Sequence, residues 1–170
     1  VAMLRDAGIS ILALPATDLY MMGRKDTHDV RRGVAPIHTL MEHGVTVGVA
    51  TNNIQNLFTP FGDGDLLKIC TLLAQTLQLG TAKSHIQCLD MATASAARAI
   101  GVKNYGVAPG NVADLVLISA KSASEAICPA PIERTVIKRG KVVAETHAQR
   151  LLFGSEVTQQ LAQRKASDAS

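Results

Sequence analysis

Two short apolar runs, separated by a helix-like segment, most constrain what this chain can fold into. The runs are ISILALP, residues 9–15, and VTVGVA, residues 45–50. Both are rich in β-branched residues and lack polar alternation, which indicates strands covered on both faces. Between them, PIHTLMEHG (residues 36–44) has a proline suited to a first helical turn and a glycine suited to a helix end. This strand–helix–strand order predicts a crossover connection between two parallel strands.

Polar segments rich in turn-forming residues follow both apolar runs, at residues 16–35 and residues 51–64. In parallel α/β folds, ligands bind at the carboxyl ends of the strands, where such loops meet. Loops of this length in a compact domain are often functional. The alternative is that their asparagines, glycines and prolines only form surface turns. Composition alone leaves these two interpretations evenly balanced.

The sequence changes from helical to strand-like patterns in its second half. Apolar positions recur at helical spacing in residues 65–80, and two further helical segments extend to Gly101. Beyond them the sequence predicts a strand in DLVLIS and a hairpin around Arg139-Gly140. We therefore predict three parts: an α/β portion over residues 1–101, a small sheet over residues 102–150 and a polar tail over residues 151–170.

Composition and motifs exclude several classes of function. The net charge is +3, and only 3% of residues are aromatic, so we expect no nucleic-acid partner. No segment approaches the roughly 18 apolar residues of a membrane span. The three cysteines form no CxxC pair, and Cys70 is predicted to be a buried structural thiol. The five histidines form no HxH or HExxH motif, and each is predicted to be a surface or capping residue.

Two long stretches of the chain resemble the amidohydrolase superfamily. MATASAARAIGVKNYGVAPGNVADLVLI (residues 91–118) and ERTVIKRGKVV (residues 133–143) resemble its C-terminal end, and residues 14–67 resemble its cytosine deaminase branch. The positions that match the branch in its two site loops are Gly23, Arg24, Asp26, Thr27, Arg31, Arg32, Gly33, Pro60, Phe61 and Gly62. Members of the superfamily are metal-dependent hydrolases with a (β/α)8 barrel and a small β-sandwich.

The resemblance implies an α/β fold: the C-terminal part of a (β/α)8 TIM-type barrel, with strands seven and eight and their helices, plus part of a small β-sandwich. It also implies that this is the C-terminal portion of a longer protein, since the chain does not begin with Met. Its partner would be the missing N-terminal portion of the same fold, which carries most of the metal ligands. We also expect a cytoplasmic protein that forms a homo-oligomer.

The resemblance assigns three site residues in the loop after residue 50. Asn52 takes the position of an aspartate that binds the metal and accepts a proton from metal-bound water. Asn53 matches a substrate-contacting position, and Phe58 matches an aromatic residue that packs on a flat heterocycle. The implied cofactor is one divalent ion, Zn or Fe, which lowers the pKa of its bound water to about 7. Asn52 would be only a weak ligand, and an amide cannot act as a base near neutral pH.

The asparagine at position 52 leaves three interpretations open. Another residue carries the proton, or hydrolysis has been lost while binding is kept, or the alignment is shifted so that Asp63 or Asp65 is the acid. The third is disfavoured because both aspartates lie far beyond the predicted strand, next to a predicted helix N-cap. We expect a metal-dependent hydrolase of non-peptide C–N bonds, a deaminase or amidohydrolase acting on a cyclic amidine or aminated heterocycle. The alternative is a non-catalytic homologue that binds such a ring or serves as a structural subunit.

Overall fold

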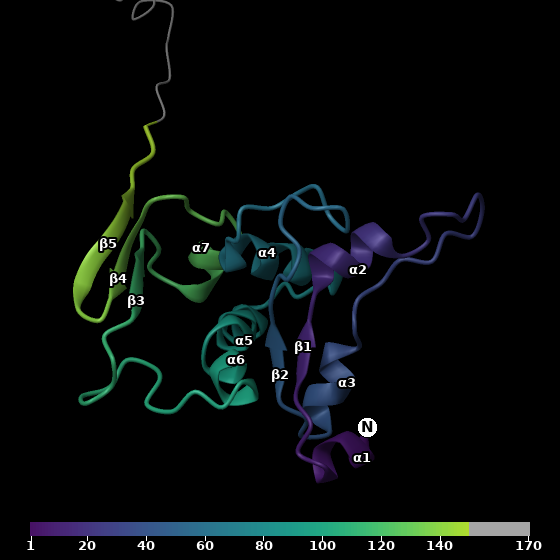
Figure 1. Cartoon of the computed structure of the whole chain (residues 1–170), viewed down its shortest axis with the longest axis horizontal. Coiled ribbons are helices and arrows are strands. Elements are labelled where there is room, and N and C mark those ends of the chain that lie inside the picture. The colour runs from purple at the N-terminus through teal and green to yellow at the C-terminus, as the bar shows by residue number, and fades with distance from the viewer. Residues whose placement is uncertain (150–170) are drawn as a thin grey trace, which may run out of the picture.

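The structure is a computed structural model that describes residues 1–149, and the predicted polar tail lies outside the described residues (Figure 1). The helices of the described part are α1 (Ala2–Asp6), α2 (Pro15–Met21), α3 (Ile37–Glu42), α4 (Leu66–Thr76), α5 (Ala82–Ala92), α6 (Ala94–Ala99) and α7 (Ala123–Ile127). Its strands are β1 (Ile11–Ala13), β2 (Val47–Val49), β3 (Leu115–Ile118), β4 (Arg134–Lys138) and β5 (Lys141–Thr146).

The predicted crossover is confirmed. β1 and β2 pair in parallel, with Ile11 opposite Val47 and Ala13 opposite Val49, and α3 lies between them in the chain. Both strands run in the same direction, so α2 and the loop after β2 lie at the same edge of the pair (Figure 1). That edge is where the sequence placed the candidate site.

The parallel pair is buried by helices on its β2 side. All three residues of β2 are buried, and α5 and α6 both contact this strand. Gly48 makes this close packing possible, because a Cβ there would lie 3.2 Å from the Ala96 Cα and 2.6 Å from the Leu12 Cδ2. The core continues through α4 and α5, where the Cys70 and Cys88 side chains have no exposed surface. The prediction that Cys70 is a buried thiol is confirmed.

The second sheet has a different character. β3, β4 and β5 pair in antiparallel order, and the predicted hairpin joins β4 to β5. Arg139 and Gly140 have φ values of 50° and 76°, as the two central residues of a tight two-residue hairpin turn require. All six residues of β5 are exposed. This three-stranded sheet lies on the far side of α5 and α7 from the parallel pair (Figure 1).

The structure departs from the sequence analysis at three places. Residues 16–35 were expected to be loop throughout, but α2 occupies their start because Pro15 supplies the fixed φ of a first helical turn. Helix α7 was not predicted; the Ser122 side chain caps it by accepting a hydrogen bond from the Glu125 N–H. His85 is not at the surface but buried, since it lies on the α5 face that packs against α7. None of the helices within residues 1–149 is long and apolar enough to span a bilayer.

Candidate active site

The two segments that follow the parallel strands are joined by side-chain hydrogen bonds. Thr17 lies in the first turn of α2, directly after β1, and its Oγ1 donates to the Asn52 Oδ1 over 3.0 Å. The Asn53 Nδ2 in turn donates to the Thr17 Oγ1 over 3.2 Å. The sequence places these partners 35 and 36 residues apart. The carboxyl ends of β1 and β2 therefore share one polar cluster.

Two more amide contacts extend this cluster along the loop. The Asn53 Nδ2 donates to the Asn52 Oδ1 over 2.7 Å, and the Asn56 Nδ2 donates to the Asn53 Oδ1 over 3.0 Å. We call Thr17, Asn52, Asn53 and Asn56 the amide network. None of its four members can carry a charge near neutral pH. The network therefore offers hydrogen-bond donors and acceptors but no base.

The hydrogen bonds of Asn52 determine which end of its side-chain amide remains available. Its Oδ1 accepts from both Thr17 and Asn53, which engages the two lone pairs of an amide oxygen. Within residues 1–149 the hydrogen bonds of this side chain all involve the oxygen, which leaves the Nδ2 amino group available as a donor. Asn52 is exposed, while Asn53 is half-buried. The side chain thus presents a neutral donor at the strand edge.

Phe58 lies in a turn of the same loop. The Asn56 Oδ1 accepts hydrogen bonds from the backbone N–H groups of Phe58 and Thr59, at 3.0 and 3.1 Å. Thr59 is buried and anchors the turn, whereas 58% of the Phe58 surface is exposed. The turn therefore holds the Phe58 ring outward, where a flat ligand can reach it.

A second aromatic group joins the loop to the segment after β1. The rings of Tyr20 and Phe61 meet edge to face, with their centroids 5.7 Å apart and their planes at 81°. The Arg24 guanidinium lies 4.9 Å from the Tyr20 ring centroid, in a cation–π arrangement. These two contacts tie the loop after β2 to α2 and to the residues just beyond it.

The loop ends at a charged pair. The Arg134 guanidinium donates to both carboxylate oxygens of Asp65 over 2.7 Å, and the Asp65 Oδ1 also accepts from the Leu67 N–H as the N-cap of α4. Only 17% of the Arg134 side chain and 13% of the Asp65 side chain are exposed. Burial alone raises the pKa of Asp65, but the bonds from Arg134 and Leu67 outweigh it and hold the pKa below its usual value.

Asp63 and Asp65 are thus both occupied by structural contacts. Asp63 pairs with Lys68, and this hydrogen bond lowers the pKa of the Asp63 carboxyl. The Asp63 Oδ1 also accepts from the Asp65 N–H over 3.1 Å. These contacts agree with the predicted turn and N-cap, and they disfavour a shifted alignment that makes either residue the acid.

Among the described residues, the side chains at the strand ends do not form a metal site by themselves. Within residues 1–149 no group of three or more His, Cys, Asp or Glu side chains is placed to hold a metal ion. The Asn52 oxygen already accepts two hydrogen bonds. Asp18, next to Thr17 in α2, is the one nearby carboxyl whose pKa is raised, and burial is the cause. The residues described here therefore do not by themselves fit a divalent cation.

Sequence reasoning missed two residues that shape the site. Thr17 lies in the segment predicted as loop, and only its position directly after the first apolar run could have indicated it. Arg134 lies 69 residues from Asp65, and no local pattern marks such a pair. Asn52, Asn53 and Phe58 all lie on one loop, but Phe58 takes part in the cluster only through its backbone N–H.

Comparison with known proteins adds independent information. The profile of the amidohydrolase family matches residues 2–143. The N-isopropylammelide isopropyl amidohydrolase of Pseudomonas sp. (strain ADP) is 34% identical over 111 residues, which are 65% of this chain and 28% of that protein. The pterin deaminase of Rhizobium rhizogenes (strain K84) is 36% identical over 143 residues, which are 81% of this chain and 31% of that protein. The chain thus spans about a third of the length of these relatives.

Solved structures of other proteins share the fold of this chain. The 5-methylcytosine deaminase of Klebsiella pneumoniae, liganded with 5-fluorocytosine, superimposes with a TM-score of 0.78 and 28% identity over 88% of this chain and 37% of that chain. The atrazine chlorohydrolase TrzN of Arthrobacter aurescens TC1, complexed with zinc, shares the fold with a TM-score of 0.62 and 22% identity, covering 95% of this chain and 37% of that chain. These superpositions support the α/β fold that the sequence predicts. The family profile and the relatives support the resemblance to the amidohydrolase superfamily. The chain belongs to the amidohydrolase family, in its cytosine deaminase-like branch.

Proposed function

We propose that this chain is part of a hydrolase that cleaves non-peptide C–N bonds in a nitrogenous heterocycle, as a deaminase or amidohydrolase. The observation that carries the proposal is the amide network, which gathers Thr17, Asn52 and Asn53 where two parallel strands end. Relatives named for N-isopropylammelide, pterin and 5-methylcytosine support a ring as the substrate. Because the chain spans about a third of these relatives, the activity is proposed for the whole protein.

The fold fits this role if β1 and β2 are strands seven and eight of a (β/α)8 barrel. Their parallel pairing, with α3 as the crossover, is the repeating unit of such a barrel. We assign residues 1–101 to this barrel portion and residues 102–150 to the returning strands of a small sandwich. The remaining barrel strands would come from the missing N-terminal portion. A cytoplasmic homo-oligomer remains part of the proposal.

Each predicted site residue receives a role that its contacts allow. The Asn52 Nδ2 donates to an acceptor atom of the ring, because its oxygen is held by Thr17 and Asn53. Asn53 positions Asn52 and contacts the substrate beside it. The exposed Phe58 ring packs on the flat face of the heterocycle, as aromatic side chains do on planar ligands.

The metal belongs to the proposal for the whole protein. The proposed cofactor is one divalent ion, Zn or Fe, with its ligands outside the described residues. The TrzN structure, complexed with zinc, supports such a cofactor for the fold. In this chain, Asn52 would contribute at most a weak contact, after giving up one of its two hydrogen bonds. The residue that accepts the proton also has to be another group, since an amide is not a base near neutral pH.

A second function is favoured by the same asparagine. An uncharged network with its acceptor oxygen already engaged suits recognition of a ring better than proton transfer. The alternative is therefore a non-catalytic homologue that binds a nitrogenous heterocycle or serves as a structural subunit. The hydrolase and the ring-binding homologue use the same strand edge, so these two differ in turnover and not in location.

Metal content and product release separate the two functions. The full-length protein is analysed for bound metal and then incubated with a pyrimidine, a pterin and a triazine, while ammonia or amine is measured. One tightly held divalent ion per chain with release from one ring class supports the hydrolase. Saturable ring binding without metal or turnover supports the binding protein.

The Asn52→Asp variant sharpens this test. An aspartate can accept the same bonds from Thr17 and Asn53 while a second oxygen stays free to take a proton. If an acid has been lost, turnover should rise by about a hundredfold, in the range of general acid–base catalysis. Leu57→Asp is the matched control, because it adds the same charge to the same loop at a side chain that is 97% exposed and outside the amide network, and it should give no gain.

A further inference from the structure

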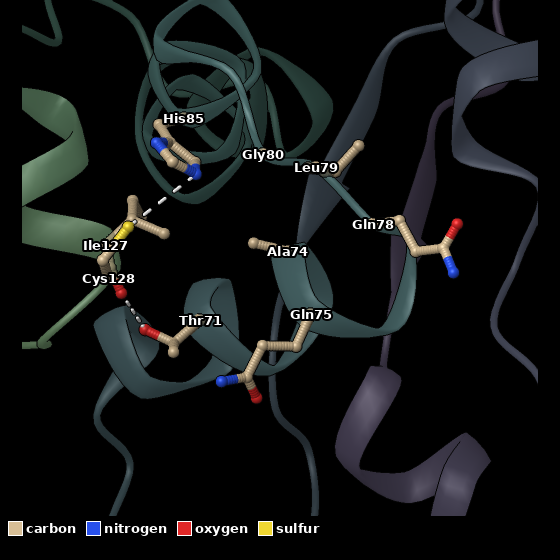
Figure 2. Close-up of a pocket in the computed structure, with 9 residues that line it drawn as sticks. All are labelled: Thr71, Ala74, Gln75, Gln78, Leu79, Gly80, His85, Ile127 and Cys128. Atoms are coloured by element: carbon tan, nitrogen blue, oxygen red, sulfur yellow. Dashed lines mark hydrogen bonds between the residues drawn. The ribbon is translucent and has the colours of Figure 1, made fainter.

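A cavity of about 400 Å³ lies between α4, α5 and α7 and shares no lining residue with the amide network (Figure 2). Its volume falls in the range of small-molecule pockets. The residues that line it are Thr71, Ala74, Gln75, Gln78, Leu79, Gly80, His85, Ile127 and Cys128. The proposed hydrolase function uses none of them.

Two of the lining residues, His85 and Cys128, contact each other, and Ser124 contacts His85 from outside the lining. His85 is 6% exposed, and its Nδ1 lies 2.9 Å from the Ser124 Oγ. Its Nε2 faces the Cys128 Sγ at 4.0 Å, and Figure 2 shows the ring and the sulfur directed at each other. When the Nδ1 carries the ring proton and donates a hydrogen bond to the Ser124 Oγ, the Nε2 has no proton and can accept that of the thiol. The three side chains thus form a nucleophile, a base and a group that orients the base.

The backbone that carries the Cys128 thiol is held by the surrounding helices. Cys128 is the C-cap of α7, and its own backbone N–H donates to the Ser124 carbonyl over 2.9 Å. The Thr71 Oγ1 on α4 donates to the Ile127 carbonyl over 2.5 Å, which ties the end of α7 to the cavity wall. Cys128 is nevertheless exposed. A buried base therefore stands beside a held but accessible nucleophile.

We propose that Cys128 is a covalent modification site for small α,β-unsaturated carbonyl compounds that enter this cavity. His85 takes the thiol proton as the sulfur forms a bond to the β-carbon of the ligand. The π electrons of the ligand move to the α-carbon, which then receives the proton back from the imidazolium. The result is a net addition that needs no other reactant.

The rest of the cavity suits such a ligand. Ala74, Leu79 and Ile127 supply apolar surface for its carbon skeleton, and Gln75 in the lining carries an amide group that can donate to its carbonyl oxygen. The other two cysteines serve as internal references. Cys70 and Cys88 are fully buried, and burial raises the pKa of their thiols to about 12 and about 11.

The test uses N-ethylmaleimide on the folded full-length protein at neutral pH, with each cysteine followed by peptide mass mapping. A synthetic peptide of residues 122–134 provides the reference rate for Cys128 without its surroundings. We expect Cys128 to react at least about tenfold faster than in the peptide, a modest general-base effect. Cys70 and Cys88 should stay unlabelled in the folded protein. Equal rates in protein and peptide would overturn the proposal.

Two variants isolate the role of the histidine. His85→Gln should reduce the Cys128 rate to that of the peptide, with circular dichroism showing that the fold is kept. An undiminished rate in a folded His85→Gln protein would remove the base from the proposal and so refute it. If His85→Gln does not fold, Ser124→Ala decides. It removes only the hydroxyl that orients His85, so a slower rate supports the proposal and an unchanged rate counts against it.

Discussion

The loop of residues 51–65 is held differently at its two ends. At its start, Asn52 and Asn53 bond to Thr17 through neutral groups, and Asn52 is exposed. At its end, Asp65 and Arg134 form a two-point ion pair that is more than four-fifths buried. The neutral end faces the strand edge, whereas the charged end reaches β4 of the second sheet.

The two ends of the loop differ in how much their contacts contribute to stability. A hydrogen bond between neutral, exposed groups contributes little net stability, so its members can be exchanged for function at small cost. A buried ion pair is costly to break, because the remaining charge loses its partner without regaining full hydration. The charged end therefore fixes the position of the loop, whereas the neutral end contributes little to it.

The largest effect is expected at the charged end. Arg134→Met removes the guanidinium and leaves the Asp65 carboxylate buried without its ion-pair partner. We expect the free energy of unfolding to fall by about 3 kcal/mol, measured by urea denaturation. The free energy of unfolding of Arg134→Lys should lie between those of wild type and Arg134→Met, because an ammonium keeps the charge but cannot form the two-point contact. A loss of less than about 1 kcal/mol in Arg134→Met would mean that the pair behaves like an exposed one.

The same pair predicts a dependence of stability on pH. Because the folded protein holds the pKa of Asp65 below its usual value of about 3.9, the pair's stabilisation is fully present above that pH. It is lost as the pH falls through the lower pKa of the folded state. In Arg134→Met the buried carboxylate loses the bond from Arg134, so its pKa lies above that of the wild type. The difference in the free energy of unfolding between the two proteins should therefore narrow as the pH falls through the acidic range.

Urea titrations of both proteins between about pH 5 and pH 2 measure this narrowing. The comparison cancels the contributions of Asp63 and Asp114, whose pKa values are also lowered, by Lys68 and Lys138. Asp65→Asn is the control, since asparagine can keep the N-cap of α4 without the charge. A difference that stays constant across this range would show that Asp65 does not titrate with the pair.

The sequence predicted the contacts at the two ends of this loop to different extents. The strands, the crossover and the Asp65 N-cap were predicted because each depends on residues close together in the chain. The amide network was partly predicted, since Asn52 and Asn53 directly follow an apolar run. Thr17 and Arg134 were not, because their partners lie 35 and 69 residues away and produce no periodic pattern.

The buried histidine illustrates the same limit. His85 is four residues after the Thr81 cap of α5, a place where a polar residue commonly faces solvent. Its burial depends on α7, a five-residue helix that the sequence did not reveal. Contacts between short elements depend on how the helices stack, and local propensity does not determine that stacking.

A middle-sized effect is expected inside the loop. Asn56→Ala removes the oxygen that accepts from the Phe58 and Thr59 N–H groups, together with the bond to Asn53. We expect a loss of about 1 to 2 kcal/mol in urea denaturation, because the turn at the buried Thr59 loses its acceptor. Asn56→Asp keeps that acceptor and should retain most of the stability. Equal losses in the two variants would show that the bond to Asn53 carries the effect instead.

The smallest effect is expected at the neutral end. Thr17→Val keeps the shape of the side chain but removes the hydroxyl that donates to Asn52 and accepts from Asn53. Because Asn53 still donates to the Asn52 oxygen, we expect a loss of only about 0.5 to 1 kcal/mol in urea denaturation. Thr17→Ser keeps the hydroxyl and should behave like wild type. A loss as large as that of Arg134→Met would contradict the division of the loop, since the amide network would then fix its position as firmly as the ion pair does.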